Sequence, residues 1–232
     1  MSTHSVAEQP AGNPAALLHH FDSAAQQKEA STLGMWAFLI TEVMFFGGFF
    51  VAYICYRHYY FDAFMAASNT LNIPLGAFNT TVLIVSSLTM AMAVHSAQLG
   101  KRTPLVIFLI LTMILGATFL GVKAVEYADK FTHHHVPGPN FVFDGPNAHG
   151  AQLFFSLYFG MTGLHATHMI VGIAIMIPIL LAAMKGKYTP DYYTPVEMFG
   201  LYWHFVDIVW IFLFPLLYLL GGHLAPGAGG HH

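Results

Sequence analysis

Charged side chains are scarce in this sequence. Only 8% of its 232 residues are Asp, Glu, Lys or Arg, whereas about a quarter is usual for a soluble domain. Hydrophobic residues make up 56% of the chain and the mean hydropathy is +0.59. This composition indicates a membrane protein. The net charge is only -3 and no basic run occurs, so nothing in the sequence supports nucleic-acid binding.

Cysteine is almost absent as well, since Cys55 is the only one. An internal disulfide is therefore excluded, and the redox compartment is left open. A single thiolate also excludes an Fe–S cluster or a thiolate-bridged copper pair held by this chain.

The first residues lack the basic start and apolar core of a cleaved signal peptide. We interpret residues 1–30 as a polar tail and the first apolar segment as the signal anchor. Residues 223–232 read as a flexible C-terminal tail.

Five apolar segments are each long enough to cross about 30 Å of hydrocarbon. They run from Leu33 to Tyr56, Ile73 to Ala97, Pro104 to Ala128, Gly150 to Met184 and Val196 to Leu220. With no internal repeat, residues 31–222 predict one all-α, multi-pass transmembrane bundle of five helices. The fourth segment exceeds the bilayer thickness, which predicts a tilt, an extension past the membrane, or a bend near Gly160, Gly163 or Pro178.

The basic residues predict a cytoplasmic N-terminus and a periplasmic C-terminus, because basic residues favour the inside. In that orientation two of them, Arg57 and Lys130, lie outside. The loop 129–149, with His133 to His135, would also lie on the outer face. Five basic residues lie inside: Lys28, Lys101, Arg102, Lys185 and Lys187.

Glu42 lies midway along the first segment, with no basic residue one turn away. A carboxyl group in the middle of a membrane is a functional candidate, and the alternative is a protonated Glu hydrogen-bonded to a neighbouring helix. Gly47 and Gly48, one turn on, predict close approach of another helix.

The last segment carries His204 and Asp207 within an apolar stretch. Helical spacing places Trp203, Asp207 and Trp210 on one face, and His204 three residues before Asp207. We therefore expect an aromatic wall beside a hydrogen-bonded His204–Asp207 pair. The simpler explanation of this pair is polar contact between packed helices, with a catalytic role as the alternative.

Two further pairs are spaced three residues apart. Lys123 and Glu126 are expected to form an intrahelical ion pair, with a lipid-headgroup contact as the alternative. His165 and His168 could meet on one helix face, and we interpret them as hydrogen-bonded packing residues. Two His ligands do not complete a zinc site, and bis-His haem ligation would need a residue such as His204 from a facing helix.

Five motifs follow one another along the apolar segments. They are Trp36 to Phe50 with its Thr-Glu-Val-Met-Phe-Phe core, Asn79-Thr80, Val125 to Tyr127, Gly163 to Gly172, and Tyr202 to Trp210. In type, order and spacing they resemble subunit III of the haem-copper respiratory oxidases, most closely the bacterial cytochrome c oxidase type. The resemblance covers residues 31–222.

The resemblance implies a subunit of the bacterial inner membrane with no catalytic residue, redox cofactor or metal of its own. Haem and copper would lie in partner subunits I and II, which take electrons from cytochrome c. This chain would pack against subunit I, bind phospholipid and support proton uptake. Glu42 matches the family's buried carboxylate, and four residues match its interior polar positions: Glu126, His165, His204 and Asp207. Longer members have two further N-terminal spans that form one wall of a lipid-filled cleft, so we expect the five-span form here.

Two other functions are compatible with the sequence. Within the family, the chain could be subunit III of a bo-type quinol oxidase, because another subunit sets the electron donor. In a different class, the buried ionisable groups could line the path of a free-standing proton or cation carrier. The lack of an inverted repeat and of broken half-helices argues against a carrier.

Overall fold

A computed structural model of the chain describes residues 21–132, 136–138, 141, 143 and 147–219. Among these residues, five helices are long and apolar enough to cross a membrane, which confirms the predicted number of spans and the all-α class. They are α1 (Ala24–Tyr59), α3 (Ile73–Gln98), α4 (Arg102–Thr132), α5 (Ala148–Met184) and α6 (Thr194–Phe214). The His133 to His135 triplet and the predicted C-terminal tail lie outside the described residues.

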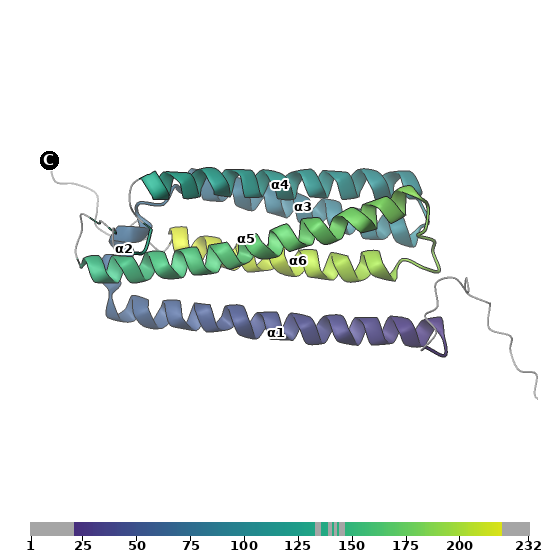
Figure 1. Cartoon of the computed structure of the whole chain (residues 1–232), viewed down its shortest axis with the longest axis horizontal. Coiled ribbons are helices and arrows are strands. Elements are labelled where there is room, and N and C mark those ends of the chain that lie inside the picture. Colours follow the sequence, from purple (N-terminus) through teal and green to yellow (C-terminus); the bar gives the residue numbers. More distant parts are fainter. Residues whose placement is uncertain (1–20, 133–135, 139–140, 142, 144–146, 220–232) are drawn as a thin grey trace, which may run out of the picture.

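The five long helices lie side by side as one bundle (Figure 1). The start of α1 and the end of α6 lie at opposite ends of the bundle, as an odd number of spans requires. Helix α5 runs obliquely to its neighbours and continues through Pro178. The most extensive helix pair is α3 with α4, whereas α1 lies at the edge and packs on α5 and α6.

Helix α1 begins at Ala24, nine residues before the start that hydropathy predicted. The hydroxyl of Ser23 accepts a hydrogen bond from the Gln26 N–H at 3.2 Å, which satisfies one of the free donors at the helix start. Lys28 then pairs with Glu197 at the start of α6, with 3.2 Å between Nζ and Oε2. Residues 24–30 of the predicted tail are therefore part of α1 and lie against α6, and residues 1–20 of that tail lie outside the described residues.

Two short elements escaped the sequence prediction. Helix α2 (Phe61–Ser68) follows α1, and the π-helix η1 (Pro215–Leu219) ends α6. The Tyr53 hydroxyl donates to the Leu216 carbonyl at 2.8 Å, and the Ser68 hydroxyl donates to the Leu217 carbonyl at 2.7 Å. Carbonyls at a helix end have no partner within the helix, so α1 and α2 supply donors for the end of the last span.

The prediction that Gly47 and Gly48 allow close approach of another helix is wrong, and one place where helices do pack closely is around Trp203. A Cβ added at Gly172 of α5 would lie 2.9 Å from the Trp203 ring, and one at Gly116 of α4 would also lie 2.9 Å from it. A Cβ at Gly47 or Gly48 would meet nothing within 4 Å. The bulky indole of α6 therefore requires glycine on two facing helices.

Because the surroundings of Gly172 and Gly48 differ in this way, a change to alanine is expected to have opposite effects on stability at the two positions. Gly172→Ala is expected to lower the free energy of unfolding by about 1–3 kcal/mol, because overpacking a filled core forces neighbours out of place. Gly48→Ala is expected to be neutral or to raise it by up to about 1 kcal/mol, because alanine favours the helix. Thermal unfolding of both variants in mild detergent checks the pair, and equal shifts would contradict the packing described here.

Candidate functional site

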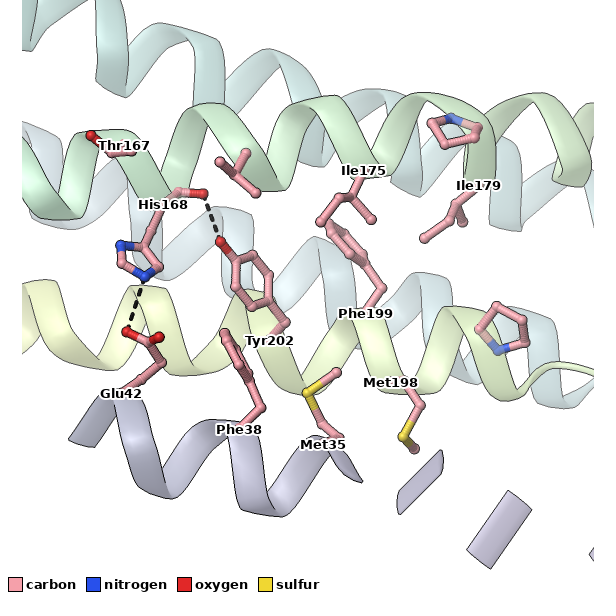
Figure 2. A pocket seen from close by; sticks show the side chains of 13 residues that line it. Met35, Phe38, Glu42, Thr167, His168, Ile175, Ile179, Met198, Phe199 and Tyr202 are labelled. Atoms are coloured by element: carbon pink, nitrogen blue, oxygen red, sulfur yellow. Dashed lines mark hydrogen bonds and ion pairs between the residues drawn. The ribbon is translucent and has the colours of Figure 1, made fainter. Parts of the chain in front are cut away.

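Glu42 is paired with His168 on the neighbouring helix α5 (Figure 2). The distance from Glu42 Oε2 to His168 Nε2 is 3.1 Å, and both side chains are mostly buried. His168 Nδ1 lies 2.9 Å from the Leu164 carbonyl, which only accepts, so Nδ1 must be the donor in that bond. The contact on the other side of the ring then holds one proton, on either the carboxyl or the imidazole. Glu42 thus has a hydrogen-bonding partner on a neighbouring helix. The second interpretation in the sequence analysis, a Glu hydrogen-bonded to another helix, required such a partner.

The Glu42–His168 pair lies at the wall of a groove between α1, α5 and α6 (Figure 2). The groove has a volume of about 660 Å³, and apolar side chains such as Phe38, Ile175 and Met198 line most of it. The Tyr202 hydroxyl also lies at this wall and donates to the His168 carbonyl at 2.8 Å. The groove therefore combines a long apolar surface with one proton-bearing pair.

Lys123 and Glu126 form the predicted ion pair, with 2.8 Å between Nζ and Oε2. Both are buried. Lys123 also donates to the Tyr218 hydroxyl at 2.8 Å, and Tyr218 donates to Glu126 Oε1 at 2.5 Å. Tyr158 donates to the same carboxylate oxygen at 2.9 Å. The Lys123 ammonium lies 4.7 Å from the Trp210 ring centroid, a cation–π distance. This cluster joins α4, α5 and η1 through fully engaged polar groups.

The predicted His204–Asp207 pair is absent. His204 Nδ1 lies 2.7 Å from the Ser87 hydroxyl on α3. Asp207 is only 2% exposed, and its carboxyl group interacts with the side chain of Ser87, the same hydroxyl that bonds His204. The partner of His204 is therefore Ser87 on the facing helix α3, and not Asp207 on its own helix as the sequence predicted.

The expected His165–His168 pair is also absent. His165 is fully buried, and its ring lies 5.2 Å from those of Phe119 and Trp210. Neither of its nitrogens has a hydrogen-bond partner in the described part of the chain. His168 instead bonds Glu42 at the wall of the groove, so the two imidazoles contact different neighbours.

The two tryptophans of α6 are anchored to α3 by their indole N–H groups. Trp203 donates to the Ser86 hydroxyl at 3.0 Å and Trp210 donates to Thr80 at 3.1 Å. Both rings are fully buried, as the expected aromatic wall requires. Sequence reasoning missed Ser86, Ser87, Tyr158 and Tyr218, whose only signal was a hydroxyl group inside an apolar span.

No group of three or more His, Cys, Asp or Glu residues that could hold a metal ion occurs within the described ranges. The polar groups found there are a pair between helices, Glu42–His168, a cluster around Lys123, and single buried groups such as His165. Hydrogen bonds from several of these groups attach the helices to one another.

Comparison with known proteins gives a consistent result. The family model described as "Cytochrome c oxidase subunit III" matches residues 16–222. Quinol oxidase subunit 3 of Bacillus spizizenii is 32% identical over 189 residues, which cover 82% of this chain and 86% of the relative. Cytochrome c oxidase subunit 3 of Corynebacterium diphtheriae is 32% identical over 208 residues, covering 86% and 96%. Cytochrome bo(3) ubiquinol oxidase subunit 3 of Pseudomonas aeruginosa is 29% identical over 203 residues, covering 88% and 91%.

Proposed function

This chain belongs to the cytochrome c oxidase subunit III family, and from that premise we propose that it supports proton uptake, lipid binding and the stability of subunit I in a proton-pumping cytochrome c oxidase. It is an accessory, multi-pass subunit of a haem-copper oxidase in a bacterial inner membrane. In the proposal the N-terminus is cytoplasmic and the C-terminus periplasmic. Subunits I and II hold the haem and copper, and the complex takes electrons from cytochrome c.

The observation that carries the proposal is the Glu42–His168 pair at the wall of the apolar groove. The hydrogen bond between the two side chains places one proton between a carboxyl and an imidazole that are 3.1 Å apart, so it can pass from one to the other without a large movement. Ionisable groups inside a membrane are costly and are retained where they serve a function. The pair therefore suits a subunit that assists proton uptake by a neighbour.

The groove beside the pair supports the lipid-binding part of the proposal. Its walls are apolar and it lies between membrane-spanning helices, so an acyl chain would contact the same groups as in the bilayer interior. Polar side chains occur where Glu42, Thr167, His168 and Tyr202 line it. A phospholipid tail fits this surface better than a polar solute does.

The remaining polar residues would stabilise the subunit and its contact with the catalytic one. Lys123 and Glu126 join three elements, and Trp203 and Trp210 fix α6 to α3. The other buried groups, His165, His204 and Asp207, would have supporting roles in the same bundle. None of them would react with oxygen or exchange electrons.

A quinol oxidase is the second candidate, because the relatives named above include subunit 3 of a quinol oxidase and of a bo(3) ubiquinol oxidase. Another subunit of the complex sets the electron donor. Copper bound to subunit II of the purified complex would favour the cytochrome c type, and a subunit II without copper would favour the quinol type.

Deletion of this chain tests the accessory role. We expect the haem spectrum of the remaining complex to be largely unchanged, while proton uptake slows or the complex loses activity sooner during turnover. Adding back the wild-type chain should restore both properties, and adding back Glu42→Gln shows whether the carboxyl is needed for the uptake rate. Loss of the haem signal on deletion, with subunit I still present, would contradict an accessory role.

A further inference from the structure

Helix α1 is attached to the other helices by polar contacts at separate points along its length. Near its start, Lys28 Nζ lies 3.2 Å from Glu197 Oε2 on α6 and donates to the Tyr193 hydroxyl at 3.2 Å. Among the described residues, the next hydrogen bond or ion pair from α1 to another helix is Glu42 with His168. At 1.5 Å per residue, roughly 20 Å of helix separates these two attachments.

The apolar groove lies between the two attachments. On α1 it begins at Met35, about two turns after Lys28. On α6 it reaches Pro195 and Met198, which lie around Glu197 in the sequence. Figure 2 shows Met35 and Met198 at the side of the groove away from the carboxyl–imidazole pair. The Lys28–Glu197 contact therefore joins α1 to α6 at one end of the groove.

The part of α1 beside the groove has few other attachments. A Cβ added at Gly34 would meet nothing within 4 Å. The hydroxyl groups of Ser31, Thr32 and Thr41 donate to carbonyls of α1 itself and not to another helix. Only apolar contacts would therefore keep the start of α1 against α6 once the contact of Lys28 was broken.

The exposure of this contact makes it easy to break. The side chains of Lys28 and Glu197 are 43% and 28% exposed, whereas those of Lys123 and Glu126 are 4% and 3% exposed. A partly exposed ion pair contributes little to stability and is screened by salt. The pair at the start of α1 can therefore open and close while the buried cluster keeps the rest of the bundle together.

We propose that Lys28, Tyr193 and Glu197 form a latch that controls the exchange of phospholipid between the groove and the bilayer. The closed latch holds the start of α1 on α6 and so closes the groove on that side. When the latch opens, this part of α1 moves aside and an acyl chain enters or leaves between the two helices. The inference rests on the lipid-binding part of the proposed function and adds what regulates that site.

The exchange of a bound phospholipid in the intact complex tests the latch. The complex is loaded with spin-labelled phosphatidylcholine, and the release of the label into unlabelled phosphatidylcholine vesicles is timed. Lys28→Met should speed release roughly two- to fivefold, the factor that corresponds to the free energy of a partly exposed ion pair. Lys101→Met is the matched control, because Lys101 is exposed and does not line the groove. Equal release from Lys28→Met and the wild type would overturn the proposal.

Salt gives a second readout. Because salt screens the ion pair, release from the wild type should become faster as the ionic strength rises, and Lys28→Met should have lost this dependence. The exchanged pair Lys28→Glu/Glu197→Lys should restore both slow release and its dependence on salt. The same dependence on salt in Lys28→Met as in the wild type would contradict the latch.

A measurement that needs no bound lipid separates this proposal from the proposed function. Ile179 lines the groove on α5 and is 9% exposed. With the exposed Cys55 changed to serine, Ile179→Cys should react faster with a membrane-soluble maleimide when Lys28→Met is added. If it does, but the wild type holds no labelled phospholipid, lipid binding is wrong and the latch is correct. If the label binds, but neither its release nor the maleimide reaction depends on Lys28, the latch is wrong and lipid binding is correct.

Discussion

Replacing Lys123 by methionine is expected to lower the free energy of unfolding by about 3–5 kcal/mol, the usual cost of removing one partner of a buried ion pair. The substitution leaves the buried Glu126 carboxylate without its cation, and the Tyr218 hydroxyl loses the donor at 2.8 Å. It also removes the charge from the face of Trp210. Unfolding of the complex in mild detergent, followed by loss of this subunit's folded signal, measures the effect.

The double variant Lys123→Met/Glu126→Leu separates the two contributions. Because an apolar pair carries no desolvation penalty, we expect it to recover much of the stability that the single variant loses. Lys101→Ala, at an exposed position between α3 and α4, is the matched lysine control and should change stability by less than about 0.5 kcal/mol. A single variant as stable as wild type would mean that the cluster contributes nothing.

Trp203→Ala is expected to have a similarly large effect, a loss of about 3–5 kcal/mol. The indole is fully buried, fills the space left by Gly116 and Gly172, and donates to the Ser86 hydroxyl. Its removal would leave a cavity shared by three helices and an unpaired buried hydroxyl.

Trp36→Ala is the matched control, because Trp36 lies on α1 and is 54% exposed. It removes the same side chain without opening a core cavity, so we expect a change within about 1 kcal/mol. Thermal unfolding in one detergent compares the two variants. Equal losses would show that the tryptophans act through hydrophobicity alone and not through their packing positions.

The sequence predicted most reliably those features that depend on one helix at a time. Hydropathy identified the five spans, and the spacing of three identified the Lys123–Glu126 pair, because helix geometry alone brings those residues together. Helix α2 was missed because its eight residues are too few for a membrane span. The π-helix was missed because hydropathy does not distinguish it from the α-helix it continues.

Contacts between helices were the part that sequence could not supply. His168 pairs with Glu42 across 126 residues, and His204 with Ser87 across 117. At helical spacing His168 also has His165 as a neighbour, and His204 has Asp207. Both neighbours looked equally suitable as partners. Which neighbour is chosen depends on how the helices are rotated in the bundle, and a single sequence contains no measure of that rotation.

The edge position of α1 has a consequence for how the chain is made. Its contacts with the rest of the bundle include Glu42 with His168 and Tyr53 with Leu216, which are 126 and 163 residues apart. At about 5–20 residues per second, a ribosome needs roughly 6–25 s to reach His168 after Glu42. For that interval Glu42 has no His168 to pair with, so the first helix cannot complete its contacts at the edge of the bundle until α5 has been made.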